Sequence, residues 1–299
     1  MLAVVGTVPV EDFPLTAGDV RLENDALILG GRSVPVNRGT PALIAAAVAA
    51  GKVLENDAPF VYLVGDIGTG KGSRDLYAHL TRHLRNTAFE AVTFHYLQPD
   101  VDWHNRVLFA LEEMRIKPVL IADAGFMYAA KMSGQAGSYD LFTPDAGELA
   151  FLADEEAPHP FYTRGFILHE DNRLPELIAR AYEHDNAARC LLVKGKQDYI
   201  ASREGILATV DEPMVETLEP VGGTGDTVTG IVSALVASGM GVEDSAVLAA
   251  RANRMAGFYA DPTPATQVLE IIRHIPKALE AVMAGNTTAS WPPTMRDTC

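Results

Sequence analysis

The feature that most constrains the fold is a regular alternation of short apolar runs with longer amphipathic segments, which begins near Pro41. The runs PFVYLV, AVTFHYL, PVLIA and CLLV have the length of strands, and segments with helical spacing lie between them. Continuous apolar strands that alternate with helices are typical of a parallel sheet covered on both faces. We therefore predict a three-layer α/β fold with a central, mostly parallel sheet and helices on both faces.

Beyond residue 198 the pattern changes to short strands and then to helices. The elements expected there are antiparallel edge strands at 199–202, 206–210 and 214–218, a helix from about Asp226, and helices near 243–259 and 265–284. Apolar residues from Val228 to Leu235 follow the spacing i, i+3, i+4 and i+7, which indicates the first of these helices. The first forty residues contain the strand-like pieces DVRLEN, ALILG and SVPVN, which the sequence does not place in the sheet.

The chain has 299 residues and shows no internal repeat and no linker. This length suits one large domain or two small ones, and the strand–helix alternation occupies most of it. We therefore predict a single domain over residues 1–285. The polar, Pro-containing segment 286–299 is expected to be a loosely ordered tail.

The net charge restricts the partners that the protein can bind. Lys and Arg together number 24 and Asp and Glu together number 39, so the formal charge at pH 7 is −15. Nucleic acids and anionic membrane surfaces bind basic faces, and we expect neither as a partner. A small anionic ligand is still compatible with this charge, because a few backbone amides can hold it.

The expected location is the cytoplasm. The two cysteines, Cys190 and Cys299, make no disulfide framework. The longest apolar run, 43–50, is far shorter than the ~20 residues that a membrane helix needs. The N-terminal segment carries Glu11 and Asp12 and lacks the basic start of a signal peptide.

The strongest chemical signal is the segment VGGTGDTVTG, where an extended stretch meets a helix. Gly222, Gly223 and Gly225 allow a tight turn that aims several N–H groups at one point, and the start of the helix adds a positive dipole. This arrangement suits a phosphate. Asp226 then has two interpretations, a helix cap or a general base that takes a proton from a substrate hydroxyl. Its spacing does not decide between them.

A second glycine cluster, GDIGTGKG, follows the first predicted strand. Gly65, Gly70 and Lys71 match the spacing of a Walker A phosphate loop, but Gly72 stands where that pattern has Ser or Thr. Asp123, at the end of PVLIA, would serve as the Walker B acid of such an enzyme. The structural alternative is a glycine turn at the carboxyl edge of the sheet, where ligands of α/β proteins bind.

Two further motifs have a chemical and a structural interpretation. Asp145 and Glu148 lie three residues apart at a helix start, either as ligands near a metal–phosphate site or as helix caps, and capping is favoured without further context. Lys194 follows the strand CLLV, where it would reach phosphate oxygens or would simply be solvated.

Taken in order, these motifs resemble the ribokinase-like superfamily, and most closely its ADP- or ATP-dependent NAD(P)H-hydrate dehydratases, which are carbohydrate-kinase-like proteins. The GTGD segment is similar to the superfamily's G-x-G-D, and GDIGTGKG, LIADAGFM, TPDAGELAFL and LLVKGK resemble other segments of the dehydratases in the same order. The resemblance runs from about Gly39 to Tyr259. It departs at 217–221, where dehydratases usually carry an Asn-Gly-Asn stretch, and at Asp145, which replaces a histidine.

The resemblance implies a site and a reaction. ATP or ADP would phosphorylate a hydroxyl of NAD(P)H hydrate with the help of Mg²⁺, and elimination of the phosphate would restore NAD(P)H. The implied roles are the general base (Asp226), the phosphate site (Gly223, Thr224, Gly225 and Lys194), the acceptor side (Gly65, Asp66, Gly68 and Asp123) and the metal site (Glu148 and Asp145).

Three alternatives stay open at this point. A kinase of the same superfamily would release the phosphate ester of a small alcohol as its product. A P-loop NTPase would use Lys71 and Asp123 instead of Asp226. A binding module would keep the nucleotide pocket without chemistry. In each case we expect a small-molecule ligand and a homo-oligomer.

Overall fold

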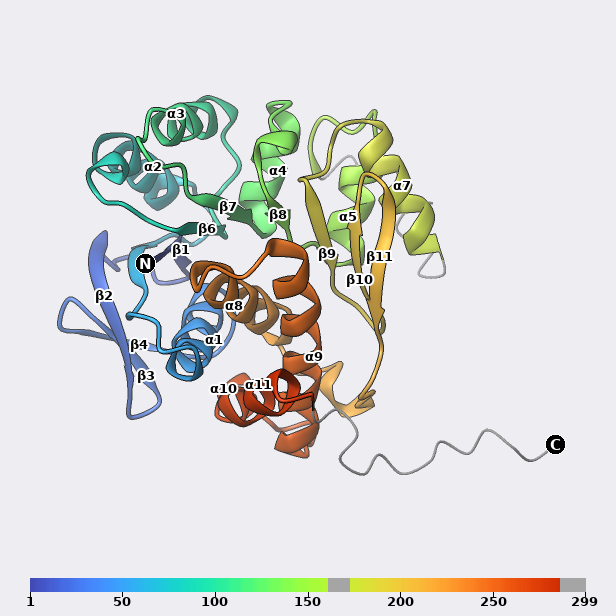
Figure 1. Cartoon of the computed structure of the whole chain (residues 1–299). Coiled ribbons are helices and arrows are strands. Elements are labelled where there is room, and N and C mark those ends of the chain that lie inside the picture. Colours follow the sequence, from blue (N-terminus) through green and yellow to red (C-terminus); the bar gives the residue numbers. More distant parts are fainter. Residues whose placement is uncertain (161–172, 286–299) are drawn as a thin grey trace, which may run out of the picture.

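The computed structural model describes residues 1–160 and 173–285, and an eleven-stranded sheet runs through this part of the chain (Figure 1). The strands are β1 (Leu2–Val8), β2 (Thr16–Glu23), β3 (Ala26–Leu29), β4 (Arg32–Pro35), β5 (Phe60–Gly65), β6 (Ala91–His95), β7 (Val119–Ala122), β8 (Leu141–Phe142), β9 (Cys190–Val193), β10 (Asp198–Ser202) and β11 (Gly205–Val210). The helices are α1 (Thr40–Val53), α2 (Lys71–His83), α3 (Val101–Glu112), α4 (Ala124–Met132), α5 (Ala146–Ala153), α7 (Leu174–Glu183), α8 (Thr224–Ala237), α9 (Val242–Ala260), α10 (Val268–Ile272) and α11 (Ile275–Met283).

The sheet is parallel at its centre and antiparallel at both edges. Its order is β11-β10-β9-β8-β7-β6-β1-β5-β2-β3-β4. The strands from β5 through β9 in this order pair in parallel. The pairs formed by β10 and β11 at one edge, and by β2, β3 and β4 at the other, are antiparallel. The predicted fold class is therefore confirmed.

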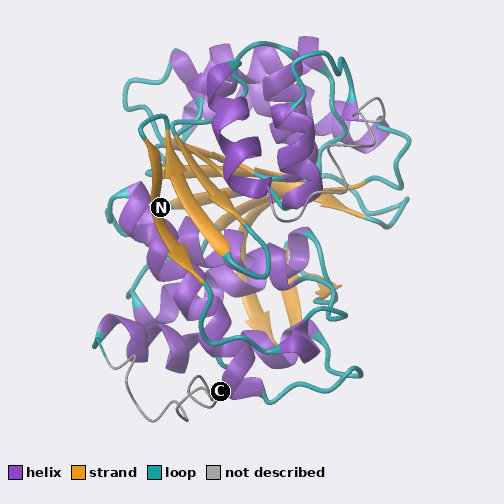
Figure 2. Cartoon of the chain, turned by 90° about the vertical axis from the view of Figure 1, so that its right-hand side faces the viewer, coloured by secondary structure: helices purple, strands orange, loops and turns teal. Residues whose placement is uncertain are grey.

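Helices cover both faces of the sheet (Figures 1 and 2). Successive residues of a strand point to opposite faces, so Val4 of β1 joins one apolar core and Val5 joins the other. The first core lies against α1, α8, α9, α10 and α11, and the second lies against α2, α3, α4, α5 and α7. Side chains on both faces of the central strands are thus removed from water, which explains their continuous apolar sequences.

Helices α1 and α8 pack unusually closely, and the reason is a glycine. A Cβ atom on Gly230 of α8 would lie 2.2 Å from the carbonyl oxygen of Leu43 and 2.9 Å from Cβ of Ala46, both in α1. The alanine-rich sequence of α1 places small side chains opposite α8. The two helices therefore bring their first turns together, and the backbone N–H of Gly39 donates to Asp226 Oδ2 at 2.6 Å.

Two sequence predictions about elements are wrong, and one strand was missed. The central strand, β1, was not predicted, because Gly6 and Thr7 interrupt its apolar run between Val5 and Val8. The strand expected at 214–218 is a single 3₁₀ turn, Glu216–Leu218, that follows Pro213. The helix expected at 265–284 is two helices, because Pro276 lies in the first turn of α11 and lacks the N–H that would continue the preceding helix.

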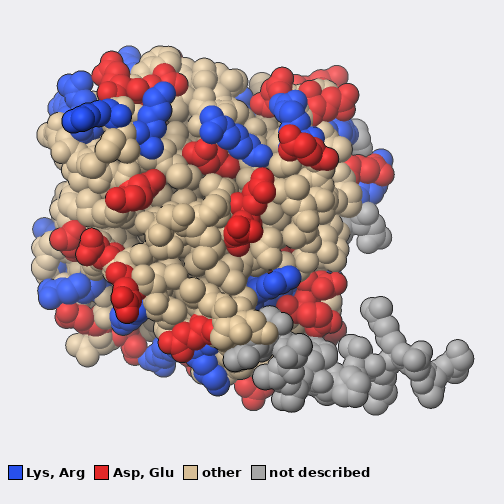
Figure 3. Space-filling view, in the orientation of Figure 1, with Lys and Arg blue, Asp and Glu red and all other residues tan. Residues whose placement is uncertain are grey.

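The other predicted strands and helices lie within a few residues of their expected bounds, and the N-terminal pieces DVRLEN, ALILG and SVPVN correspond to β2, β3 and β4. The expected tail, 286–299, lies outside the described residues. None of the helices in the described segments combines the length and the apolar character that a bilayer crossing requires. On the face shown in Figure 3, basic side chains lie interspersed with acidic ones.

Candidate active site

The carboxyl ends of the parallel strands carry a cluster of polar side chains. His95 ends β6, Asp123 follows β7, Thr143 follows β8 and Lys194 follows β9. Because parallel strands end at the same edge of a sheet, these four positions are neighbours in space although they are far apart in the sequence. Asp226, in the first turn of α8, reaches the same edge and lies 3.1 Å from His95.

Asp226 is fixed from two directions. The backbone N–H of Gly39 donates to Oδ2 at 2.6 Å, and Nε2 of His95 lies 3.1 Å from Oδ1. Burial would raise the pKa of Asp226, but the hydrogen bond from His95, the charge of Lys194 and the N–H of Gly39 outweigh it and lower the pKa. The side chain keeps 13% of its surface exposed, so an ionised carboxylate faces the open edge of the site.

Asp123 and Lys194 form a buried ion pair beside Asp226. Nζ of Lys194 donates to both carboxylate oxygens of Asp123 at 3.0 Å. Thr229 donates to Asp123 Oδ2 at 2.6 Å, and the N–H of Ala124 donates to Oδ1 at 2.8 Å. The Asp123 side chain is only 2% exposed. This carboxylate therefore orients Lys194 and has little surface left for a substrate.

Lys194 is held in its protonated form by the neighbouring carboxylates. Burial opposes the charge of its ammonium, but the carboxylates of Asp123, Glu148 and Asp226 outweigh burial and raise its pKa above the usual value. Its side chain also borders the glycine turn, since a Cβ atom on Gly225 would lie 3.6 Å from Lys194 Cδ. A permanent cation thus lies next to the start of α8.

The glycine turn itself leaves the start of α8 open. Gly223 has a φ of 102°, which favours glycine, and a Cβ atom there would lie 3.1 Å from Val268. No side chain caps the N-terminus of this helix. The first-turn amides, including those of Thr224 and Gly225, are the groups that a helix start offers to an anion. The predicted phosphate residues and the predicted base are therefore brought together with Lys194.

Asp145 and Glu148 form a capping box at the start of α5. The N–H of Glu148 donates to Asp145 Oδ1, and the N–H of Asp145 donates to Glu148 Oε2, both at 2.8 Å. Burial raises the pKa of Glu148 to about 8, assisted by the charges of Asp123 and Asp145 and opposed by Lys194. Each carboxylate uses one oxygen for the cap in the described structure. The remaining oxygens are hard ligands of the kind that Mg²⁺ prefers, so the donor set fits that ion.

A second group has the spacing of metal ligands but is already satisfied. Ligand atoms of His95, Asp123 and Asp226 lie within 4.8 Å of one another. The carboxylates, however, already accept hydrogen bonds from His95, Lys194 and backbone N–H groups. The positive charge that a metal would supply is present as the ammonium of Lys194. We therefore interpret this group as a hydrogen-bonded network.

The glycine cluster after β5 is organised by its own aspartate. Asp66 Oδ1 accepts from the N–H groups of Gly68 and Gly70, and Oδ2 accepts from the N–H and the hydroxyl of Ser73, all at 2.8–3.0 Å. Burial would raise the pKa of Asp66, and these donors lower it. A carboxylate thus occupies the amides that a P-loop would offer to a phosphate. Gly65 is needed for packing, since a Cβ atom there would lie 1.9 Å from the carbonyl oxygen of Val10.

These contacts separate the acceptor-side predictions into two groups. Asp123 lies inside the cluster around Asp226. The side-chain hydrogen bonds of Asp66 stay within its own turn, and its backbone N–H donates to the carbonyl oxygen of Val8. None of the described hydrogen bonds of Gly65, Asp66 or Gly68 links them to the cluster. Their binding of an acceptor stays a prediction.

Sequence reasoning missed four residues that complete the site. They are Gly39, Thr40, His95 and Tyr96. His95 is 1% exposed, and Thr40 Oγ1 lies 3.0 Å from its Nδ1. Tyr96 has a positive φ of 52° and is 48% exposed, and burial of its hydroxyl raises its pKa to about 12, assisted by nearby carboxylates. The available signal was a histidine within the apolar run AVTFHYL.

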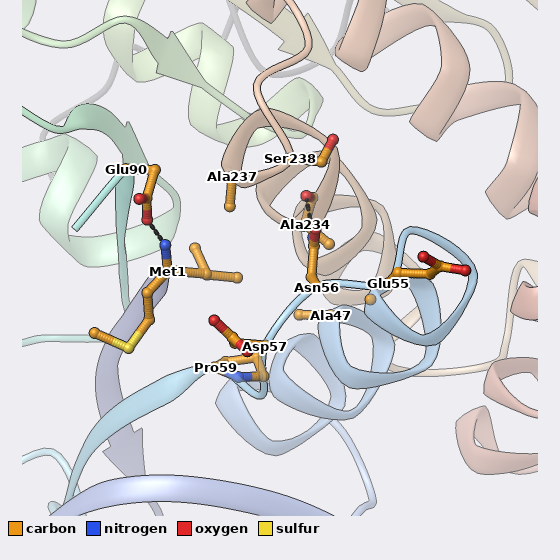
Figure 4. Close-up of a pocket in the computed structure, with 12 residues that line it drawn as sticks. Met1, Ala47, Glu55, Asn56, Asp57, Pro59, Glu90, Ala234, Ala237 and Ser238 are labelled. Atoms are coloured by element: carbon orange, nitrogen blue, oxygen red, sulfur yellow. Dashed lines mark hydrogen bonds and ion pairs between the residues drawn. The ribbon is translucent and has the colours of Figure 1, made fainter.

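A separate cavity of about 260 Å³ lies at the opposite, amino edge of the sheet (Figure 4). Its lining includes residues at the starts of β1 and β5 and at the ends of α1 and α8. Asn56 donates to the carbonyl oxygen of Ala234, and the N-terminal amine of Met1 pairs with Glu90. None of the predicted site residues lines it.

Comparisons with known proteins identify the family and the fold. A family model described as carbohydrate kinase, NAD(P)H-hydrate dehydratase, matches residues 98–277. An uncharacterized protein of Methanocaldococcus jannaschii is 42% identical over 221 residues, which is 74% of this chain and 90% of that protein.

Solved structures show the same fold at low sequence identity. A Staphylococcus aureus pyridoxal kinase superposes with a TM-score of 0.55 at 13% identity and covers 86% of this chain and 88% of its own. Phosphofructokinase-2 of Escherichia coli gives 0.54 at 13% identity and covers 94% and 99%. Bacillus subtilis YxkO, of the UPF0031 family, gives 0.54 at 13% identity and covers 93% and 91%. The fold is thus ribokinase-like, and the chain belongs to the carbohydrate-kinase-like NAD(P)H-hydrate dehydratase family.

Proposed function

We propose that this protein is an ADP- or ATP-dependent NAD(P)H-hydrate dehydratase. The observation that carries the proposal is the position of Asp226, an ionised carboxylate in the open first turn of α8, beside the ammonium of Lys194. A base, an anion-binding helix start and a fixed cation are the parts that phosphoryl transfer to a hydroxyl requires. Membership of the family supports NAD(P)H hydrate as the proposed substrate.

In the proposed reaction, the amides of Gly223, Thr224 and Gly225 bind the phosphoryl group that is transferred, and Lys194 stabilises its charge. Asp226 takes the proton as the substrate hydroxyl oxygen attacks phosphorus and the bond to the leaving nucleotide breaks. Mg²⁺ held by Glu148 and Asp145 would neutralise phosphate charge. Phosphate then leaves the new ester with the electron pair of the C–O bond, while the adjacent carbon loses a proton to water and the C=C bond of NAD(P)H is restored.

A small-molecule kinase is the second candidate. Structures of the same fold bind a nucleotide analogue, AMP-PCP, in pyridoxal kinase and fructose-6-phosphate in phosphofructokinase-2. The segment 217–221 and Asp145 differ from the dehydratase pattern, and both differences are compatible with another acceptor. The P-loop alternative has less support, because Asp66 occupies the amides of its turn. The homo-oligomer and the cytoplasmic location remain predictions.

The test is recovery of NADH absorbance from hydrated NADH with ATP or ADP. We expect recovery with wild type, and a 10²–10⁴-fold lower rate with Asp226→Asn, the range for loss of a general base. Asp244→Asn is the matched control, because Asp244 also lies third in its helix, α9. No recovery with either nucleotide contradicts the dehydratase. ADP formation from ATP with other alcohols would then support the kinase.

A further inference from the structure

His95 is a buried histidine whose two ring nitrogens are both engaged at the site. It is 1% exposed, and its Nε2 lies 3.1 Å from Asp226 Oδ1 and 3.8 Å from Asp123 Oδ2. Its Nδ1 lies 3.0 Å from the hydroxyl oxygen of Thr40. The reaction proposed above assigns no task to this side chain.

The partners define which nitrogen carries the proton. Carboxylate oxygens only accept hydrogen bonds, so Nε2 must be the protonated nitrogen and must donate to Asp226. The hydroxyl of Thr40 can donate to Nδ1, which then acts as the acceptor. With a neutral ring, the hydroxyl of Thr40 therefore donates to His95, and His95 donates to Asp226.

Gly6 in β1 allows His95 and Thr40 to approach each other. A Cβ atom on Gly6 of β1 would lie 2.6 Å from the carbonyl oxygen of His95 and 2.6 Å from two side-chain atoms of Thr40. Glycine at this point of the central strand lets both residues approach. The N–H of Gly39 meanwhile holds the other oxygen of Asp226, Oδ2, at 2.6 Å. Two donors from different elements thus fix both carboxylate oxygens.

We propose that His95 is a positioning residue for the reaction proposed above: with Thr40 behind it, its Nε2–H holds Asp226 so that the carboxylate meets the substrate hydroxyl in one orientation. The inference rests on the proposed function, since it takes Asp226 to be the base. A correctly oriented base is worth a large factor in rate, because a misdirected carboxylate must first rotate toward the hydroxyl.

The same contact keeps the base ionised. The charged and titratable groups near Asp226 are His95 of β6, Asp123 after β7, Lys194 after β9, and Tyr96. Glu148 of α5 acts on Lys194 and Tyr96. Burial would raise the pKa of Asp226, and His95, Lys194 and the N–H of Gly39 lower it. Loss of His95 therefore raises the pKa of Asp226, and the acid limb of the pH–rate profile moves to higher pH.

The experiment compares His95→Phe, which keeps a flat ring without a donor, with His95→Gln, whose amide can donate to Asp226. We expect His95→Phe to lower kcat about 10²-fold, to leave the nucleotide KM within about threefold, and to move the acid limb upward. His95→Gln should recover kcat to within about tenfold of wild type. His104→Gln is the control, because His104 is equally buried but bonds to the Tyr139 hydroxyl.

Two results overturn the proposal. One is a His95→Phe enzyme with the wild-type kcat and pH profile. The other is an equal loss in His95→Phe and His95→Gln without any change in the pH profile, which indicates a structural role alone.

A measurement without turnover separates this proposal from the proposed function. In ¹⁵N NMR of wild type, the ring of His95 should show a protonated Nε2 and an unprotonated Nδ1, and Asp226→Asn should shift the Nε2 signal. If wild type turns over no substrate but shows this shift, the proposed function fails and the His95–Asp226 bond stands. A His95 signal that is unaffected by Asp226→Asn overturns the bond itself.

Discussion

Helices α1 and α8 each begin at the carboxyl edge of the sheet and end at its amino edge, so the same two helices build two contrasting surfaces. Their first turns meet where Gly39 donates to Asp226, and their last turns border the cavity of Figure 4. Helix starts present N–H groups and helix ends present carbonyl groups. One edge therefore suits anions, and the other repels them.

The acidic side chains of the two edges differ in their burial and in their pairing. At the carboxyl edge the Asp123 side chain is 2% exposed and is paired with Lys194. At the amino edge the Glu90 side chain is 58% exposed, and Glu55 and Asp57 lie nearby in the cavity lining. The comparison teaches that a cavity does not by itself identify an active site. The chemistry that we propose depends on buried charges that are paired near the helix starts.

The variant with the largest expected effect on this difference removes the cation at the carboxyl edge. Lys194→Met keeps the side-chain volume and leaves the buried Asp123 carboxylate without its partner. We expect the free energy of unfolding to fall by about 3–5 kcal/mol, the usual cost of breaking a buried pair, and turnover to be lost. Urea denaturation and the NADH assay measure the two effects.

Two further variants are the controls for Lys194→Met. Lys194→Met with Asp123→Asn removes both charges and should regain part of the stability without regaining turnover. Lys52→Met, in the last turn of α1, should change neither. A Lys194→Met protein that unfolds at the wild-type urea concentration would show that the pair contributes little.

The second test separates the two helix starts without touching a polar group. Gly230→Ala would place a Cβ atom 2.2 Å from the carbonyl oxygen of Leu43, so α1 and α8 must move apart. We expect a loss of about 1–3 kcal/mol in the free energy of unfolding. Turnover should fall as well, because the bond from Gly39 to Asp226 lengthens. Gly137→Ala is the control, since nothing lies within 4 Å of a Cβ atom there.

The third test uses pH at the carboxyl edge. Burial raises the pKa of Glu148 to about 8 from the ordinary 4.5, so the folded protein binds this proton more tightly than the unfolded chain does. The contribution of Glu148 to stability is therefore complete below pH 4.5 and is lost as pH rises toward 8. We expect the Tm of Glu148→Gln to decline less over this range than the wild-type Tm.

Glu270→Gln supplies the comparison, because Glu270 forms an exposed capping box in α10. Added Mg²⁺ should raise the wild-type Tm near pH 8 more than that of Glu148→Gln. Parallel pH curves for wild type and Glu148→Gln would refute the assigned protonation.

The smallest effect is expected at the amino edge. Glu90→Gln removes an exposed ion pair to the amine of Met1, and such pairs contribute little. Stability should stay within about 0.5 kcal/mol of wild type and turnover should be unchanged. A loss of turnover in this variant would show that the two edges are coupled.

Local sequence signals were sufficient for much of this picture. The strand CLLV has the predicted bounds, and GGTGD indicated the start of the helix that carries Asp226 in its first turn. That Lys194 lies near this turn was implied only by the family resemblance. The residues around Asp226 were harder to predict, because Gly39 and His95 are distant in the sequence and meet Asp226 only through the order of the strands. His95 also lies in a run that reads as an ordinary buried strand. The central position of β1 depends on pairing with β5 and β6, which no local pattern shows.

That central position has a consequence for synthesis on the ribosome. β1 leaves the ribosome before any other strand, but its two partners are β5 and β6, and β6 ends only at His95. Before β5 has emerged, the apolar LAVVGTV segment has neither of its neighbours to pair with, and it still lacks β6 until His95 has emerged. The nascent chain thus carries an incompletely paired β-forming segment until β5 and β6 have both emerged, which is the period when chaperone binding would matter most for this sheet.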